Sequence, residues 1–184
     1  KKIEVKEIIG KPELSLNKTN IEFKNVEFKY QSTDQKAVKN INLKIQGNSM
    51  AAFVGHSGAG KSTIINLIPR FYDPQHGTIK IDDQDIKNVS LSSLRKKISM
   101  VSQDVILFDD SIKNNISYAK SNASEEEILK ACKFAAADEF IEKLPEGLNT
   151  IIGENGIRLS GGQKQRISIA RAILKESPII LLDE

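Results

Sequence analysis

The sequence predicts an α/β fold in which a mainly parallel sheet carries helices on its faces, with an antiparallel β part near the N-terminus. Residues 21–30 and 38–45 alternate apolar and polar side chains, as half-buried strands do. Residues 49–54 and 178–183 are short apolar runs, the pattern of strands buried on both faces. Helical spacing alternates with such runs, which is typical of a parallel sheet. Between about residues 104 and 160 strand patterns disappear, which predicts a helical subdomain.

Shorter signals place the remaining elements. Ser124 and the three glutamates after it form an N-cap with an acidic first turn, which predicts a helix through Ala136. Residues 1–20 are polar, contain Pro12 and show little periodicity, so we expect a linker or a frayed arm. The other expected elements are strands at 78–81 and 98–102 and helices at 91–97 and 161–174.

The composition limits the class of protein. A length of 184 residues suits one domain with a real core, and 39% hydrophobic with 28% charged residues is the balance of a soluble globular protein. The net charge of +3 is too small to argue for nucleic acid as a partner. Cys132 is the sole cysteine, which excludes an intrachain disulfide and favours a core-filling role. No run approaches the roughly 18 apolar residues of a membrane helix, so we expect this stretch to be soluble and any membrane role to come through a partner or a further segment.

Residues 55–62 match the phosphate-binding pattern G-x-x-x-x-G-K-[ST] in full. Glycines let the backbone wrap around a phosphate with its N–H groups pointing inward, and a following helix adds the positive end of its dipole. Lys61 is expected to reach the β- and γ-phosphates, Ser62 to bind Mg²⁺ and Thr63 to donate to the α-phosphate. The pattern therefore predicts a P-loop NTPase (RecA-like) core that binds ATP and Mg²⁺, rather than a glycine-rich turn that matches by chance. The candidate nucleotide-binding residues are Gly55, Ser57, Gly58, Ala59, Gly60, Lys61, Ser62 and Thr63.

Two carboxylates, Asp183 and Glu184, end the last apolar run. Taken alone, these two carboxylates are explained equally well by a strand end that reaches solvent. In a P-loop fold such a strand lies beside the phosphate loop, where Asp183 would hold Mg²⁺ and Glu184 would act as the general base on the attacking water.

The run Leu159–Gln163 reads LSGGQ, and with the phosphate loop and the acidic strand end it resembles the signature of the ABC transporter nucleotide-binding domain. The resemblance extends from about residue 20 to the end of the chain. Ser160 caps a helix whose glycines expose backbone N–H groups, so the chain carries a second anion-binding helix end. The resemblance implies a head-to-tail homodimer in which Ser160 and Gly162 face ATP held by the second copy. Gly161 and Gln163 complete the candidate set at this helix end.

The same resemblance implies roles for other positions. Tyr30 stands where the family places an aromatic residue that stacks on adenine, although an ordinary strand aromatic remains the alternative. Gln103 follows the expected strand 98–102, where the family has a glutamine. The resemblance implies that this glutamine touches Mg²⁺ or the lytic water and senses the membrane domain. Residues 153–156 stand where exporters contact their membrane domains. His56 and His76 receive no catalytic role.

Within the family, residues 101–184 most resemble the cassettes of bacterial lipid A flippases, although multidrug and peptide exporters share much of the pattern. The resemblance implies an ATPase that drives transport of a lipid A-like or amphipathic substrate, with transmembrane domains as partners and a place at the cytoplasmic face of the inner membrane. It also implies that residues 1–20 are a linker from the membrane domain, that 21–184 are the ATP-binding domain and that about 104–160 are its helical subdomain.

Two other functions are compatible with an LSGGQ sequence. Chromosome-maintenance and DNA-repair ATPases insert a long coiled coil before it, whereas fewer than a hundred positions without sustained heptads separate Lys61 from Ser160. A regulatory module without hydrolysis is disfavoured by an intact Glu184. Because the family's D-loop, switch histidine and last strands would follow Glu184, we expect a fold that is incomplete after this Walker B strand, and hydrolysis by this stretch alone stays open.

Overall fold

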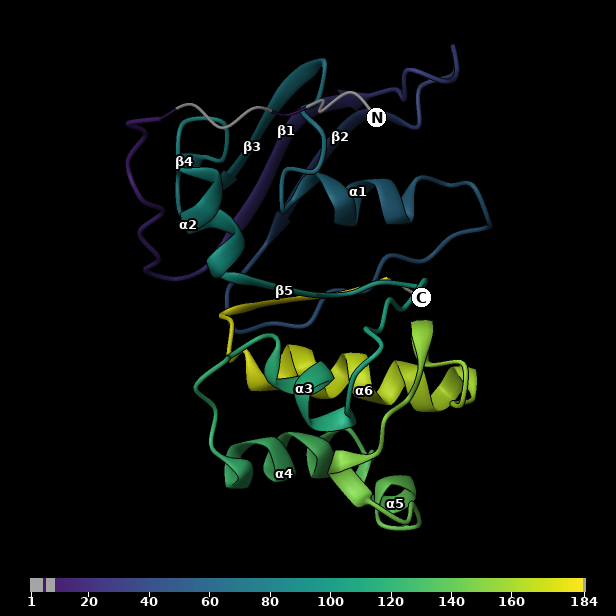
Figure 1. Ribbon diagram of the computed structural model, residues 1–184. Helices are drawn as coiled ribbons and strands as arrows, with labels where there is room; N and C mark the ends of the chain where they lie inside the picture. The colour runs from purple at the N-terminus through teal and green to yellow at the C-terminus, as the bar shows by residue number, and fades with distance from the viewer. Residues whose placement is uncertain (1–4, 6–8, 184) are drawn as a thin grey trace. The chain divides into compact units, whose positions relative to one another are not determined.

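A computed structural model describes residue 5 and residues 9–183, and the chain divides into two compact units, Lys1–Ile98 and Ser99–Glu184. The elements of each unit are labelled in Figure 1. The first unit combines a small sheet with short helices, and the second is mainly helical. The mixed α/β class expected from the sequence is confirmed, but the expected mainly parallel sheet is not what the described residues form, because their larger sheet is antiparallel.

The sheet of the first unit is antiparallel throughout, as expected for the N-terminal part. Its strands are β1 (Ile21–Phe28), β2 (Val38–Ile45), β3 (His76–Ile81) and β4 (Gln84–Asp85), arranged in the order β2-β1-β3-β4. Ile21 pairs with Ile45 on one side and with Ile81 on the other, so β1 is the central strand. Its inward side chains Phe23 and Val26 are fully buried and form the core of the unit.

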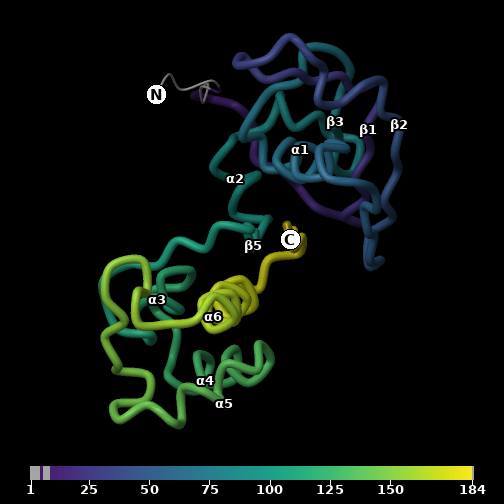
Figure 2. Tube along the Cα trace, turned by 90° about the vertical axis from the view of Figure 1, so that its right-hand side faces the viewer, coloured from purple at the N-terminus to yellow at the C-terminus, as the bar shows by residue number. Residues whose placement is uncertain are grey.

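The helices of the first unit are α1 (Lys61–Leu67) and α2 (Leu91–Lys96). Both views place α1 beside the sheet (Figures 1 and 2). Leu67 and Leu94 are completely buried, so each helix contributes an apolar face to the core. Ser90 caps α2 by accepting a hydrogen bond from the Ser93 N–H, which confirms the helix predicted at 91–97.

The strand expected at residues 49–54 is absent, which makes this prediction wrong. The segment adopts no regular structure, and Met50 and Val54 are 99% and 94% exposed. Burial of a strand on both faces requires paired neighbours and covering layers. The strand order of the sheet in the first unit does not include this segment, so that sheet supplies no paired neighbour.

Residues 11–20 pack onto the first unit and do not form the frayed arm that the composition suggested. Leu14 is buried, and its N–H donates to Ser93 Oγ at 2.9 Å. The Ser90 N–H donates to the carbonyl of Pro12 at 2.8 Å. The polar composition did not predict this packing, because the segment is held mainly by hydrogen bonds of its backbone.

The strongest of these backbone contacts involve Asp82, in the turn between β3 and β4. Its Oδ2 accepts hydrogen bonds from the N–H groups of residues 17, 18 and 19 at 2.7, 3.1 and 2.8 Å, and its Oδ1 accepts one from Asn20 at 2.9 Å. Burial opposes ionisation of Asp82, but these four bonds together outweigh it and hold the pKa of the carboxyl below its ordinary value. One carboxylate therefore organises residues 17–20.

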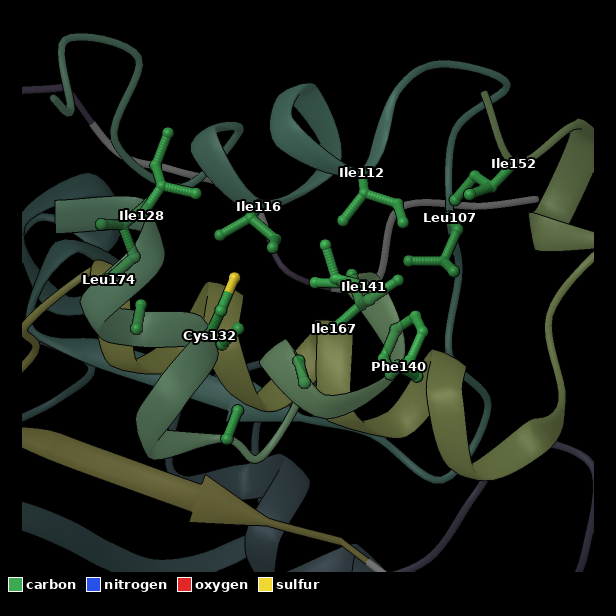
Figure 3. Packing of buried hydrophobic residues seen from close by; sticks show 14 residues of the cluster. Leu107, Ile112, Ile116, Ile128, Cys132, Phe140, Ile141, Ile152, Ile167 and Leu174 are labelled. Carbon is green, nitrogen blue, oxygen red and sulfur yellow. The ribbon is translucent and has the colours of Figure 1, made fainter. Parts of the chain in front are cut away.

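The second unit is built around helices. They are α3 (Ile112–Ser117), α4 (Glu125–Phe134), α5 (Asp138–Ile141) and α6 (Gly161–Leu174), with 3₁₀ turns at Gly147–Asn149 and Glu154–Gly156. α6 has the predicted bounds, and Ser124 and Glu127 form a reciprocal capping box at the start of α4. The helices enclose a core, shown in Figure 3, that includes Leu107, Ile112, Ile116, Ile128, Cys132, Phe140, Ile141, Ile152, Ile167 and Leu174.

The short strands β5 (Ile98–Val101) and β6 (Ile179–Leu182) pair with each other. The Asp183 N–H, just after β6, donates to the carbonyl of Val101 at the end of β5 at 2.9 Å. The two strands therefore end at the same edge and run parallel, as the fold class requires. The prediction that β6 is buried on both faces is wrong. Ile180 and Leu182 are 52% and 55% exposed, and only the alternate residues Ile179 and Leu181 are buried.

No helix among residue 5 and residues 9–183 has both the length and the apolar character needed to cross a bilayer.

The Asp82 contacts predict a local loss of order in the variant Asp82→Asn. Its amide NH₂ would face three N–H donors that Oδ2 now accepts, so we expect a loss of stability on the order of 1–3 kcal/mol. Because the folded-state pKa is lowered, the contribution is complete above the ordinary pKa of 3.8 and is lost as the pH falls through the folded value. Urea unfolding of both proteins across that pH range, with hydrogen exchange of residues 17–20, would measure the effect.

The matched control is Asp83→Asn, which alters the exposed neighbouring carboxylate. Equal stability of Asp82→Asn and Asp83→Asn at neutral pH would contradict the assigned role of Asp82.

Candidate nucleotide-binding site

The glycine-rich loop at residues 55–60 leads directly into α1. Gly58 and Gly60 adopt φ angles of 80° and 88°, in the region that side-chain-bearing residues rarely enter. A Cβ on Gly60 would lie 2.4 Å from the carbonyl oxygen of Ala37, so this position accepts no side chain. The Ile64 N–H donates to the Gly60 carbonyl at 3.0 Å, which joins the loop to the first turn of α1.

Lys61, the first residue of α1, turns its side chain back over the loop. Its Nζ donates to the carbonyls of Gly55 and His56 at 2.8 and 2.9 Å. An ammonium group held by neutral carbonyls exchanges them favourably for phosphate oxygens, because charge-assisted hydrogen bonds are stronger. The loop thus combines a cation, a helix start and an exposed backbone, which suits an anionic ligand.

Tyr30 lies at this loop, although 33 positions before Thr63 in sequence. Its hydroxyl is 3.0 Å from Thr63 Oγ1. The ring makes edge-to-face contacts with Phe28 at 4.8 Å and Tyr72 at 5.3 Å. Thr63 is 6% exposed, and its hydroxyl oxygen has this contact with Tyr30 inside the unit. Tyr72 was missed, and its only sequence signal is an aromatic residue shortly after the expected helix.

The second predicted anion site is the start of α6. Ser160 Oγ accepts a hydrogen bond from the Gln163 N–H at 3.3 Å, and Gln163 Oε1 accepts one from the Ser160 N–H at 2.9 Å. Gln163 therefore uses its side-chain amide to cap its own helix. Ser160, Gly161 and Gly162 are exposed. A Cβ on either glycine would meet nothing within 4 Å, so the packing of the chain itself does not require glycine there.

Gln103 lies in the second unit, in a groove that also contains the start of α6. The exposed Gln103 lines this groove together with Asp104, Val105, Gly161, Lys164 and Gln165. The groove brings the predicted glutamine and the signature helix together, which their separation in sequence did not suggest. Lys164 adds a cationic side chain that sequence reasoning did not select.

The predicted magnesium ligands offer hard oxygen donors, the type that Mg²⁺ prefers. Ser62 is exposed at the start of α1 in the first unit, and Gln103 and Asp183 belong to the second unit. Asp183 follows β6 directly, where the parallel pair ends. Glu184, the predicted general base, lies outside the described residues. Within residue 5 and residues 9–183, no three His, Cys, Asp or Glu side chains gather in a way that could hold a metal.

Comparison with known proteins adds an independent finding. Residues 38–184 match the sequence profile of the ABC transporter family. The ATP-dependent lipid A-core flippase of Pectobacterium atrosepticum is 53% identical over 176 residues, which cover 95% of this chain and 30% of that protein. The flippase of the same name from Pasteurella multocida is 55% identical over 165 residues, or 89% of this chain and 28% of that protein. The chain thus spans less than a third of the length of these relatives.

A solved structure of a bacterial Atm1-family ABC exporter with ATP bound is also similar. It superposes with a TM-score of 0.95 at 45% identity, over 100% of this chain and 32% of the exporter chain. This likeness supports the α/β architecture and the order of its elements.

The loop geometry predicts different outcomes for two glycine variants. Gly60→Ala places a Cβ 2.4 Å from the Ala37 carbonyl, whereas Gly58→Ala meets nothing within 4 Å, and both positions have positive φ. We expect both variants to be strained by roughly 1 kcal/mol, and Gly60→Ala to lose several times more stability and its binding of a nucleotide. Thermal unfolding and titration with a fluorescent ATP analogue would measure this. Equal behaviour of the two variants would show that contact with Ala37 does not restrict the loop.

Proposed function

The chain belongs to the ABC transporter family, and from this membership we propose that it is the ATP-binding and ATP-hydrolysing domain of an exporter that moves a lipid A-like or other amphipathic substrate across a membrane. The observation that carries the proposal is the pair of largely exposed, glycine-rich helix starts in one chain, at residues 55–62 and 160–162. The names of the flippase relatives support a lipid substrate. In this assignment residues 21–184 are the ATP-binding domain, about 104–160 its helical subdomain, and 1–20 the linker to the membrane domain.

ATP is proposed to bind at the glycine-rich loop. The backbone N–H groups of Gly55, Ser57, Gly58, Ala59 and Gly60 surround the phosphates, and Lys61 Nζ leaves the two loop carbonyls for the β- and γ-phosphates. Tyr30, whose ring belongs to the aromatic group beside the loop, stacks on the adenine. Thr63 reaches the α-phosphate by donating its hydroxyl hydrogen, and the same oxygen can still accept a hydrogen bond from the Tyr30 hydroxyl.

Hydrolysis is proposed to use the oxygen donors at the ends of α1, β5 and β6. Ser62, Gln103 and Asp183 would hold Mg²⁺, which would offset the negative charge that builds on the phosphates. Glu184 accepts a proton from the attacking water as the oxygen of that water bonds to the γ-phosphorus, and the bond to ADP breaks. The products are ADP and inorganic phosphate.

A second copy of the chain is the proposed partner at the signature helix. Glycine is a poor helix former, and Gly161 and Gly162 have no internal neighbour that excludes a Cβ. A close approach from outside the chain explains both residues. In a head-to-tail dimer, Ser160 and the backbone at Gly161–Gln163 face the γ-phosphate of the ATP held by the other copy, and the two-fold arrangement closes on itself.

The membrane domains of the same transporter are the other proposed partner. Residues 153–156 include a left-handed backbone at Asn155 and are followed by Ile157, which is 79% exposed. An exposed apolar side chain on a strained loop suits contact with another protein surface. We propose that the domain lies at the cytoplasmic face of the inner membrane, where closure and opening of the dimer move the membrane domains. Nucleic acid is not a proposed partner.

Substitution of the general base tests the chemistry. In the full-length protein, we expect Glu184→Gln to keep ATP affinity and to lower kcat by about 10²–10⁴, because the amide cannot accept the proton of the water. Phosphate release from lipid-reconstituted protein measures the change. Glu176→Gln, which alters an exposed carboxylate paired with Lys120, is the control and keeps its turnover. Unchanged turnover in Glu184→Gln would remove this residue as the base.

The signature glycines predict that stability and function change in opposite directions. We expect Gly162→Ala to stabilise α6 by up to about 0.5–1 kcal/mol, because alanine loses less backbone entropy. The same methyl group blocks approach of the second copy's ATP, so ATP-dependent dimerisation is lost. Urea unfolding and light scattering with and without ATP measure the two effects. Lys130→Ala on the exposed face of α4 is the control, and normal dimerisation of Gly162→Ala would contradict the shared site.

A further inference from the structure

Asn115 forms a polar centre inside the second unit that the proposed chemistry does not use. This residue of α3 is 0% exposed. Its Oδ1 accepts a hydrogen bond from the Phe108 N–H at 2.9 Å, and its Nδ2 donates to the Phe108 carbonyl at 3.0 Å. Nδ2 also donates to the carbonyl of Ser111 at 3.0 Å. One amide therefore holds both backbone groups of Phe108, as a neighbouring strand would.

Arg171 of α6 completes this centre. Its Nη2 donates to Asn115 Oδ1 at 3.1 Å, and its Nε donates to the Asn115 carbonyl at 2.9 Å. Its Nη1 donates to the Ile106 carbonyl at 3.1 Å, and the guanidinium lies 5.9 Å from the centre of the Phe108 ring. Burial lowers the pKa of Arg171, and Tyr118 opposes this shift only in part. All three bonds of the guanidinium end on neutral oxygens.

The elements joined in this way carry two parts of the proposed site. Residues 106–108 follow Gln103 closely, and Ile106 and Phe108 are 67% and 44% exposed. Arg171 stands in the same continuous helix as the cap Ser160. A helix transmits displacement along its axis because its hydrogen bonds resist extension. The contacts of Asn115 and Arg171 are thus a direct mechanical connection between the segment after Gln103 and the start of α6.

Stability alone does not explain this choice of residues. A buried charged or polar group is often replaced by an apolar one of similar volume without loss of stability. What an apolar side chain cannot supply is a directional bond to a backbone N–H or carbonyl group, because dispersion contacts depend little on orientation. The fork of Arg171 and the amide of Asn115 instead fix residues 106–108 against α6 through five hydrogen bonds with defined geometry.

We propose that Asn115 and Arg171 are positioning residues that make residues 105–108 and the signature helix move as one piece during the ATP cycle. This inference rests on the proposed function, because it assigns a purpose to motion at Gln103 and at Ser160. It concerns coupling between the two positions and not the binding of ATP itself.

Hydrogen exchange of the full-length protein, with and without ATP, tests the coupling directly. In the parent we expect ATP to slow exchange both at residues 160–165 and at 105–109. In Arg171→Met, ATP still protects 160–165 but no longer changes exchange at 105–109. A merely structural role would raise exchange at 105–109 equally in both states and keep the ATP-dependent difference, which would overturn the proposal.

The matched control is Arg166→Met, in the same helix. Arg166 donates to the Ala136 carbonyl at 3.0 Å and pairs with Glu139, so it joins α6 to other parts of the unit and not to residues 106–108. We expect this variant to retain the ATP response at 105–109. Loss of the response in Arg166→Met as well would assign it to general loosening of α6, and would overturn the proposal.

Kinetics give a second readout. We expect Arg171→Met to keep the KM for ATP within about twofold while the stimulation of kcat by lipid substrate is lost. The double variant with Asn115→Leu should behave as either single variant does, because the pair acts as one unit. Additive effects, or retained stimulation, would contradict the proposal. If Arg171→Met does not fold, Arg171→Lys keeps the charge but lacks the fork, and the same outcomes apply to it.

These readouts separate the inference from the proposed function. Absence of ATP protection at residues 160–165 in the parent would overturn the proposed ATP-sandwich function. Presence of that protection, with an unchanged response at 105–109 in Arg171→Met, would overturn the positioning role alone.

Discussion

Backbone N–H groups that have no partner within their own secondary structure dominate the organisation of this chain. The first turn of a helix always leaves such donors, and so does a loop that bends its N–H groups to one side. At α4 the chain satisfies them itself through Ser124 and Glu127, and at residues 17–20 through the carboxylate of Asp82. The start of α6 has the same reciprocal cap, from Ser160 and Gln163, but there the residues of the first turn, Gly161 and Gly162, lie at the surface.

The contrast between Asp82 and Lys61 shows how charge separates a structural site from a binding site. Around Asp82, a carboxylate of the chain occupies the backbone donors, and the result is a fixed segment. At residues 55–60 the nearby charge is the ammonium of Lys61, which rests on two carbonyls. A negative charge from the chain would compete with a phosphate, whereas a positive one attracts it. The same backbone chemistry thus stabilises the fold in one place and supports ligand binding in the other.

In the interior of the second unit, the polar centre at Asn115 and Arg171 also satisfies backbone groups with side chains of the chain itself. Most of that interior is packed with isoleucine and leucine, which stabilise it by close apolar contact but offer no hydrogen bonds. Directional bonds occur where residues 106–108 meet α6, between the proposed glutamine and signature positions. Stability therefore comes from the apolar cluster, and relative placement from the buried amide and guanidinium.

Local patterns predicted elements well where a single helix or hairpin contains all the interactions that matter. The start of α6 followed from Ser160 and Gln163, which cap each other three residues apart, and the strand 38–45 followed from its alternation. The run 49–54 and the burial of β6 were predicted wrongly, because apolar composition does not say which neighbours cover a strand. The packing of residues 11–20 escaped prediction for a similar reason, since its partners, Asp82 and Ser93, are distant in sequence.

The sequence by itself determined the family, the phosphate loop and the signature, because their chemistry depends on residue types at fixed short spacings. Only the tertiary structure decided that Tyr30 meets Thr63, that Gln103 shares a groove with Gly161, and that Arg171 reaches Asn115 and Ile106. Each of these contacts joins segments tens of residues apart. Their geometry depends on how helices and strands pack, which no local spacing encodes.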